Sequence, residues 1–508
     1  MTFNFESGQE PTVKLAAYTQ DYENEGPYKV AVASARTCYS KNIVLPSEVK
    51  ASHDAIAQSV YQAGHHTVFQ HASFTFQLSG SSRHLVWSTL HSHQMYNSEQ
   101  QSQRFVEVGG DGWVIKPAFT NDRHKKIWDT TVAHQYQDYQ DLCRILQVPA
   151  QEELTRLFPR RAALYLQGKD KAFGSMLKKK AQEVARYVLP IACTTNLYFS
   201  VNMITLMRLW HTVHLSDTPA EALLTIGKMV SLVCGIDPKL KTVFEEPITG
   251  ADTLWETQFQ PVHQPPKDSL ISHTANAEDV IVQAVRAIIG NPENMTDEDL
   301  IGLVMNPAEN KLLGTKLNIT DFNRLSRTMH HVHYSFNKRL SHTGDSQDQR
   351  HRMVPGSRPF FQKAVLNPDF IVPELVNQSK EARGLYMMSM TRSWNAAQEI
   401  ASDSDNLELA QYLLPNATAI NFVESGTLLS LHHKYRMRLC LNAQEEIWRS
   451  SIAEVKAIAR VHPTIAQYLL PPCTVRSAGS HKPICPEGNR YCGVPVWKQD
   501  VTDIKRIL

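Results

Sequence analysis

The chain carries an internal repeat, and this repeat constrains its fold more than any other feature of the sequence. A histidine-rich segment followed by alternating aromatic residues occurs in the first half and returns 260 positions later. The matched residues are His71, Phe74, Phe76 and Ser81 in the first half and His331, Tyr334, Phe336 and Ser341 in the second. A pattern that recurs at a fixed spacing is typical of a structural unit that is used twice.

A second block of the repeat follows at a different spacing. The pattern AxYxLPxAxxxN begins at Ala185 and again at Ala410, a displacement of 225 positions. The two blocks keep their order, and the 35 positions lost between them predict a longer loop in the first half. We interpret the halves as a duplicated domain; the alternative is a chance match of scattered apolar positions.

Local patterns predict both strands and helices. Residues 73–78 alternate between polar and apolar side chains, as a half-buried strand does. Residues 178–189 carry one apolar stripe that stops before Pro190, and residues 279–289 carry another that stops before Gly290. Both stripes are typical of amphipathic helices with ordinary stop signals.

A proline-rich segment predicts the division of the chain into domains. Three prolines fall within residues 258–267, which is typical of a linker. We therefore expect a first domain over 1–257, a second over 268–465 and a cysteine-containing tail over 466–508.

Composition excludes some classes of protein. The net charge of +2 gives no general attraction to nucleic acid. The sequence contains no run of about 18 apolar residues, the length that a membrane helix needs. Eight cysteines over 508 residues do not make a disulfide framework, which favours a reducing compartment. We expect a cytoplasmic protein without a membrane or nucleic-acid partner.

The second half contains a basic tripeptide that is a candidate binding motif. Arg350, His351 and Arg352 are consecutive, and Ser357 and Arg358 follow a Pro-Gly bend. Three consecutive residues cannot share one face of a helix or strand, so the segment is either a solvated turn or an anion-binding loop. At a displacement of 260 the first half offers Leu-His-Ser instead of Arg-His-Arg.

The tail contains a weak candidate metal site. Three thiols and an imidazole, from Cys473, Cys485, Cys492 and His481, are a ligand set for tetrahedral zinc, but they lack a CxxC pair. The alternative is unligated thiols in an irregular tail. Cys440, further upstream, is predicted to be a small core residue.

These motifs together resemble the flavin-dependent thymidylate synthase family. GHHTVFQHASFTF, from Gly64 to Phe76, resembles the family's histidine-rich segment, and Arg350-His351-Arg352 resembles its Arg-His-Arg triplet. Ser102-Gln103-Arg104-Phe105 resembles the Ser-x-Arg-Tyr that closes the family signature, and RLCLNAQEEI, from Arg438 to Ile447, resembles a later helix. Neither half carries the whole signature, and the loop from Arg350 to Arg358 is shorter than the family's.

The resemblance implies an α+β fold, with two tandem domains of antiparallel sheet and surrounding helices, and it assigns roles to residues. The triplet would contact FAD, and His65 and His71 would line the flavin edge, although a histidine beside an aromatic strand is more often a core residue. Ser102 and Arg104 would bind the substrate phosphate. Ser357 and Arg358, the shortened form of this motif in the second half, are further candidates for binding the substrate. Arg438 would hold the uracil and favour its anionic form, and Gln347 could hydrogen-bond the substrate.

The implied reaction is the reductive methylation of dUMP to dTMP, with methylenetetrahydrofolate, FAD and NADPH. Family members assemble as tetramers, so a fused pair is expected to form a homodimer that mimics the tetramer. Two alternatives stay open: a related flavoenzyme acting on another pyrimidine nucleotide, and a non-catalytic nucleotide-binding homologue.

Overall fold

The chain folds into two compact units. The computed structural model describes residues 4–215, 218–242, 244, 269–402 and 407–508, so the expected linker over 258–267 lies outside the described residues. Unit 1 comprises Met1–Ala133, Pro190–Pro261 and Ser393–Leu414; unit 2 comprises His134–Leu189, Val262–Arg392 and Pro415–Leu508. Each unit therefore contains a segment from the other half of the sequence.

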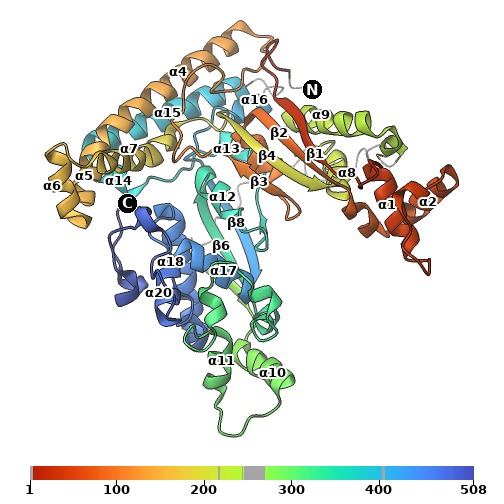
Figure 1. The fold of residues 1–508 in the computed structure, drawn as a ribbon. Helices are drawn as coiled ribbons and strands as arrows, with labels where there is room; N and C mark the ends of the chain where they lie inside the picture. The colour runs from red at the N-terminus through yellow and green to blue at the C-terminus, as the bar shows by residue number, and fades with distance from the viewer. Residues whose placement is uncertain (1–3, 216–217, 243, 245–268, 403–406) are drawn as a thin grey trace. The chain divides into compact units, whose positions relative to one another are not determined.

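Unit 1 is built on a four-stranded antiparallel sheet (Figure 1). The strand order is β1 (Thr12–Tyr18), β2 (Ser73–Ser82), β4 (Thr194–Asn202) and β3 (Asn97–Gln100). Phe74, Phe76 and Leu78 of β2 are buried and the residues between them are less so, which confirms the strand predicted from the alternating pattern.

Helices complete the core of unit 1. Apolar residues of α1 (Pro27–Thr37), α8 (Met203–Thr212) and α9 (Ala220–Ile236) pack with the sheet residues in one cluster. Figure 1 shows α9 beside β1. Unit 1 also contains α2 (Asp54–Gln62), α3 (Arg83–Leu85), a π-helix over Val86–Leu90, α16 (Leu407–Gln411) and short 3-10 helices. The helices α4 (Asp122–Ile145) and α15 (Lys380–Ala401) begin in one unit and end in the other.

Unit 2 repeats the same sheet. Its order is β5 (Ser269–His273), β6 (His333–Ser341), β8 (Ala419–Thr427) and β7 (Gly356–Ser357), again antiparallel throughout. Two sheets of one topology, built from matched segments, confirm the predicted α+β fold with two tandem copies.

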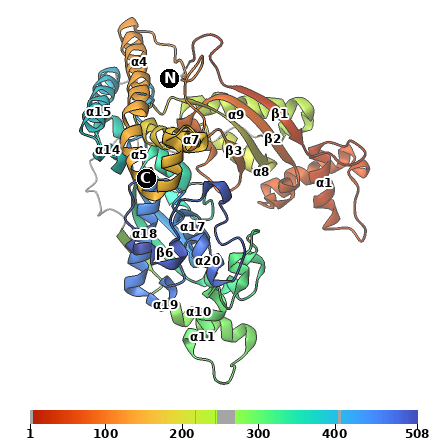
Figure 2. The same ribbon diagram turned by 60° about the vertical axis from the view of Figure 1, so that its left-hand side comes forward.

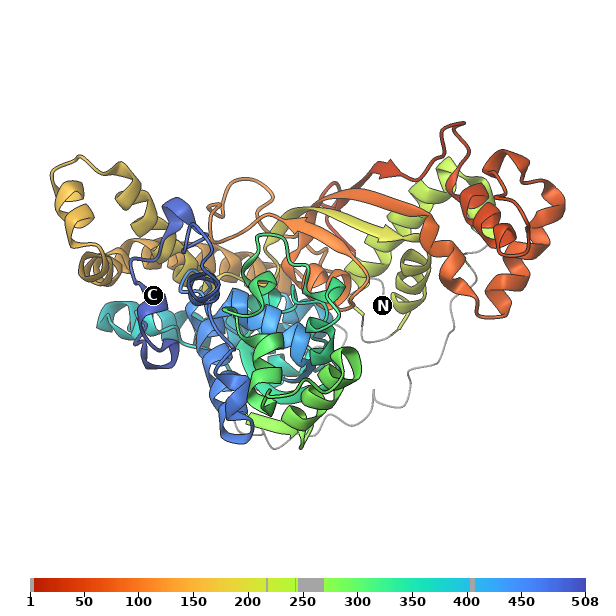
Figure 3. The same ribbon diagram turned by 60° about the horizontal axis from the view of Figure 1, so that its bottom comes forward.

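The helices of unit 2 surround its sheet. Figure 2 shows α17 (Leu428–Arg438) and α18 (Glu445–Val461) beside β6, and Figure 3 shows the green α10 (Ala277–Ile289) and α11 (Asp297–Met305) against the blue C-terminal helices. The helix predicted over 279–289 is confirmed, and Gly290 ends it with a φ of 82°. The other helices are α5 (Gln147–Leu157), α6 (Pro159–Leu166), α7 (Lys171–Ala185), α12 (His342–Asp348), α13 (Lys363–Leu366), α14 (Glu374–Asn377), α19 (Pro463–Ala466) and α20 (Pro472–Ala478).

A bulge in β2 shifts the repeat by one residue. The pairing of β2 with β4 changes register between Leu78 and Ser81, around Gly80, whose φ is 76°. Ser82 pairs with Thr194, and Ser341 pairs with Ala419, which lies 225 positions after Thr194. The match of Ser81 to Ser341 is therefore wrong beyond the bulge, because the extra residue moves the counterpart to Ser82.

The C-terminal segment predicted as a separate tail packs into unit 2. Cys473, Val496 and Val501 are buried in the same apolar cluster as residues of α17 and α18. Within the described part of the chain, no helix has both the length and the apolar character needed to cross a bilayer.

Candidate functional site

The Arg350-His351-Arg352 triplet forms a tight turn directly after α12. The amide of His351 donates to the carbonyl of Asp348 at 3.0 Å, and the amide of Val354 donates to the carbonyl of His351 at 2.9 Å. Val354 is buried and anchors the exit of the turn, whereas Arg350 is exposed. The backbone of the turn is thus held at both ends.

His351 is the uncharged member of the triplet. Burial, with the nearby charge of Arg438 as the next cause, holds the pKa of His351 well below its usual value. Its Nε2 atom is buried and has no hydrogen-bond partner among the described residues. A buried polar atom in this state is costly unless a ligand or water satisfies it.

Two other predicted residues lie next to the triplet. Arg438, at the end of α17, donates through Nη2 to the carbonyl oxygen of Gln347, in the last turn of α12. The side chain of Gln347 donates to the amide oxygen of Gln444. The structure therefore brings Arg438, Gln347 and the triplet close together, and their roles in binding stay predictions.

Ser357 and Arg358 have a different environment. The Nε and Nη2 atoms of Arg358 donate to both carboxylate oxygens of buried Asp345, at 2.5 and 2.7 Å, and its guanidinium lies 4.7 Å from the centre of the Phe422 ring. The Asp345 carboxylate raises the pKa of Arg358 although burial opposes this. Such a bidentate pair favours a structural role for Arg358. Ser357 is exposed, and the substrate contact predicted for these two residues stays a prediction.

The remaining predicted residues belong to unit 1. The amide of Arg104 donates to the hydroxyl of Ser102 at 3.2 Å, in the loop after β3. His65 and His71 are both exposed, so the core alternative for these histidines is wrong. Because the triplet lies in unit 2, the convergence of these four residues with it stays a prediction.

In the first copy, aromatic rings occupy the segment that corresponds to the triplet. The one-residue shift makes His91, Ser92 and His93 its counterparts. The rings of His91 and Tyr96 stack at 4.6 Å, His93 meets Tyr96 edge-on at 5.4 Å, and Tyr96 stacks on Phe199 at 5.9 Å. The first copy therefore keeps packed side chains where the second has guanidinium groups.

Sequence analysis missed a buried carboxylate that holds the start of α12. Glu446 accepts from the amide of Ser341 at 2.5 Å, from its hydroxyl at 2.7 Å, and from the hydroxyl of Tyr187 at 2.5 Å. Burial raises the pKa of Glu446, and these donors oppose the rise. Ser341 is also the N-cap of α12, accepting from the amide of Gly344.

Unit 1 contains the same arrangement. Glu221 accepts from the amide and hydroxyl of Ser82 at 2.8 and 2.5 Å and from the hydroxyl of Tyr412 at 3.1 Å. Burial raises the pKa of Glu221 to about 7. Both the glutamates and the tyrosines are 225 positions apart, but each glutamate bonds the tyrosine from the other half of the chain.

The exchanged tyrosine of unit 2 is connected to the triplet's neighbours. Gln444 donates to the hydroxyl of Tyr187, and its oxygen accepts from Arg186 at 2.6 Å as well as from Gln347. The first half of the sequence thus supplies part of the support for Gln347 and Arg438. Tyr187 lies in the repeated AxYxLP block, but nothing in the sequence indicates that it bonds the other half.

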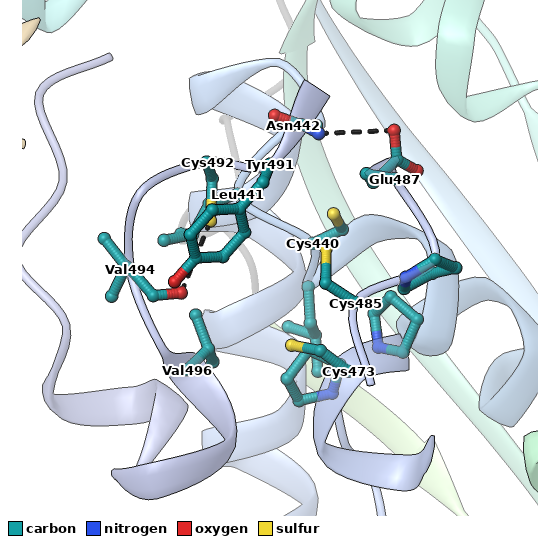
Figure 4. Close-up of a pocket in the computed structure, with 14 residues that line it drawn as sticks. Cys440, Leu441, Asn442, Cys473, Cys485, Glu487, Tyr491, Cys492, Val494 and Val496 are labelled. Atoms are coloured by element: carbon teal, nitrogen blue, oxygen red, sulfur yellow. Dashed lines mark hydrogen bonds between the residues drawn. The ribbon is translucent and has the colours of Figure 1, made fainter. Parts of the chain in front are cut away.

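The structure separates one predicted ligand of the weak metal candidate from the other three. Cys440 lines one pocket with Cys473, Cys485 and Cys492 (Figure 4), whereas His481 lies elsewhere, with its Nε2 atom 2.8 Å from the carbonyl oxygen of Lys311. Burial raises the pKa of Cys440 to about 12 and that of Cys473 to about 11. Among the described residues, no three His, Cys, Asp or Glu side chains are arranged to hold a metal ion.

The comparison with protein families finds the same repeat that the two sheets show. A family model described as thymidylate synthase complementing protein matches residues 14–239 and 269–464. The chain belongs to the flavin-dependent thymidylate synthase family. The two matched regions are the two copies of the sheet domain, so the family domain occurs twice in this chain.

Individual relatives cover one part of the chain at a time. The flavin-dependent thymidylate synthase of Clostridium tetani is 28% identical over 232 residues, which is 45% of this chain and 84% of that protein. The enzyme of the same name from Nitratidesulfovibrio vulgaris is 27% identical over 202 residues, or 38% of this chain and 70% of that protein. Both matches extend over less than half of this chain, as expected for a duplicated member of the family.

Solved structures give weaker likenesses. The ThyX protein of Helicobacter pylori, complexed with FAD and dUMP, matches with a TM-score of 0.31 and 18% identity over 40% of this chain and 98% of its own. PolB of Streptomyces cacaoi, a UMP/dUMP methylase bound with 5-Br dUMP, has a TM-score of 0.30 and 18% identity over 46% and 94%. The family assignment therefore rests on the sequence match.

The two exchanged tyrosines provide a matched pair of test variants. Tyr187→Phe and Tyr412→Phe each remove one donor from a buried carboxylate, so each is expected to lower the free energy of unfolding by about 1–3 kcal/mol. Urea denaturation measures the loss, and exposed Tyr39→Phe serves as the neutral control. Parent-like stability of both variants would show that the tyrosine bonds contribute nothing.

Proposed function

We propose that this protein is an FAD-dependent enzyme that methylates dUMP to dTMP, with methylenetetrahydrofolate as one-carbon donor and NADPH as reductant. One observation carries the proposal: in a chain of this family, the triplet forms an ordered turn that contains a buried histidine nitrogen without a partner among the described residues. Arg438 and Gln347 lie beside this turn.

The residues of the turn fit a flavin diphosphate. Arg350 is exposed and Arg352 is partly exposed, and guanidinium groups bind phosphate oxygens with paired donors that stay charged. Neutral His351 can donate one hydrogen bond through Nε2 without adding charge. Bound FAD supplies the hydride, and the protein supplies position and electrostatics. Exposed His65 and His71 are proposed for the flavin edge.

The nucleotide would be held by its two ends. Ser102 and Arg104 are proposed to bind the phosphate of dUMP through a hydroxyl and a guanidinium group. Arg438 is proposed to contact the uracil ring and to favour its anionic form, while Gln347 positions Arg438 through its carbonyl oxygen. These roles require Arg104 and Arg438 to meet at one site.

The two copies are proposed to contribute unequally. The second copy carries the triplet, whereas rings of His91, His93 and Tyr96 pack in the corresponding segment of the first. We therefore propose fewer flavin sites than family domains, in a cytoplasmic homodimer of fused pairs. The pairing of Arg358 with Asp345 favours Arg104 over Arg358 as the phosphate ligand.

The triplet is tested by the flavin. Arg352→Ala is expected to weaken FAD binding at least tenfold, because it removes a charged donor from the turn. Flavin fluorescence quenching measures the affinity, and Arg324→Ala, at an exposed arginine in the same unit, is the matched control. Equal FAD affinity of Arg352→Ala and the control would remove the triplet from the flavin site.

The substrate is tested by product analysis. With FAD, NADPH and methylenetetrahydrofolate present, dUMP is expected to gain one methyl group, about 14 mass units, in the product. Arg438→Ala is expected to reduce this conversion at least a hundredfold, because a donor to the pyrimidine is lost. Methylation of UMP in preference to dUMP would favour the alternative of a related flavoenzyme, and binding of dUMP without any product would favour a non-catalytic homologue.

A further inference from the structure

Five charged side chains are buried together inside unit 2, and we call them the buried ion cluster. Five different elements contribute one residue each: Lys338 of β6, Asp348 of α12, Glu424 of β8, Lys434 of α17 and Glu454 of α18. Their side chains are 0–1% exposed. Charged groups are almost never buried so completely unless they are paired.

Each lysine of the cluster contacts all three carboxylates. The Nζ atom of Lys338 lies 2.5 Å from Asp348, 2.9 Å from Glu454 and 3.4 Å from Glu424. The Nζ atom of Lys434 lies 3.2 Å from Asp348 and 3.7 Å from Glu454, and it also pairs with Glu424. The sheet and three helices are therefore joined at one point by ion pairs.

The charges balance only when one carboxylate carries a proton. Burial, with the neighbouring Asp348 charge, raises the pKa of Glu424 to about 8, although both lysines oppose the rise. Lys338 and Lys434 hold the pKa of Asp348 well below its usual range although burial opposes this. A proton on Glu424 thus balances the formal charges of the two lysines and the three carboxyl groups.

The first copy of the domain is built without these charges. The repeat spacing, corrected for the bulge, gives as counterparts Leu78 for Lys338, Thr89 for Asp348, Phe199 for Glu424, Leu209 for Lys434 and Met229 for Glu454. All five counterparts are buried, and four are apolar. The fold of this domain thus does not require the cluster, and an apolar core of similar volume is often equally stable.

The cluster is adjacent to the feature that distinguishes the two copies. Asp348 is the last residue of α12, and its carbonyl oxygen accepts the amide of His351 in the triplet turn. The Asp348 carboxylate contacts both lysines, so the residue that begins the turn is held from the sheet and from α17. We propose that the buried ion cluster is a positioning device that fixes the Arg350–Arg352 turn for an anionic ligand.

The identity of the ligand, FAD, rests on the proposed function. That the cluster fixes the conformation of the Arg350–Arg352 turn does not rest on it. The five cluster residues are positioning residues, because they act on the ligand through the backbone of the turn. Ion pairs have defined directions and distances, whereas apolar contacts tolerate sliding, so the cluster gives the turn one geometry at the cost of burying charge.

The position of Glu424 makes the device sensitive to pH. Loss of its proton gives the cluster a net charge of −1 in a buried site, which destabilises the arrangement as the pH rises through about 8. Besides the cluster itself, the charged or titratable neighbours are His351 and His433, Arg438, Tyr435, and the Arg358–Asp345 pair. FAD affinity is expected to fall above this pH in the parent, and Glu424→Gln is expected to remove that fall.

The first copy supplies the residues for a direct test. A variant with Lys338→Leu, Asp348→Thr, Glu424→Phe, Lys434→Leu and Glu454→Met gives the second copy the core of the first. We expect this full-length variant to fold with a parent-like or higher Tm but to bind FAD at least tenfold more weakly. Leu209→Met, a volume-conserving change in the first copy, is the control and keeps the parent's affinity.

Hydrogen exchange of the amides of residues 349–354 is the second readout. Faster exchange of these amides in the folded five-residue variant supports the proposal even if the parent does not bind FAD, so failure of the proposed function is distinguishable. Parent-like exchange together with parent-like FAD affinity would overturn it. If the five-residue variant does not fold, the pH dependence of FAD affinity in Glu424→Gln tests the proposal. An FAD affinity that still falls above pH 8 in Glu424→Gln would overturn the proposal.

Discussion

The structure around the candidate site depends on one buried carboxylate. Glu446 receives three hydrogen bonds, two from Ser341 and one from Tyr187, and Ser341 is where β6 ends and α12 begins. A buried carboxylate is costly unless its oxygens are satisfied, so the strand end, the helix start and the tyrosine segment must be in place together. The triplet turn follows at the other end of α12.

Buried glutamates of this kind also explain why the two compact units do not coincide with the two halves of the sequence. The glutamate of each half bonds the tyrosine of the other, as the pairs Glu446–Tyr187 and Glu221–Tyr412 show. A duplicated domain that exchanges a segment in this way makes each copy incomplete alone.

The two copies have diverged in a consistent direction. The second has guanidinium groups at the triplet and a cluster of charges beneath it, whereas the first has stacked rings and an apolar core at the corresponding positions. Burying charge costs free energy that an apolar core does not. The copy that carries the Arg-His-Arg turn therefore also carries the more costly interior, which is expected where geometry matters more than stability.

Features that depend on local pattern can be predicted from the sequence alone. Alternation predicts β2, stripes and stop residues predict the helices, and matched spacing predicts two copies of one domain. The triplet could be proposed as a site because its three residues are contiguous, and Arg438 because it begins a second segment that resembles the family. Other features are visible only in the folded chain, namely the exchange of Tyr187 and Tyr412, the pairing of Arg358 with Asp345, and the grouping of Lys338 with Glu454. These contacts join residues from 13 to 259 positions apart through side-chain hydrogen bonds or ion pairs, and such bonds leave no periodicity in a sequence. The bulge at Gly80 escaped prediction for a related reason, because one extra residue changes which residues pair without changing the pattern that predicts the strand.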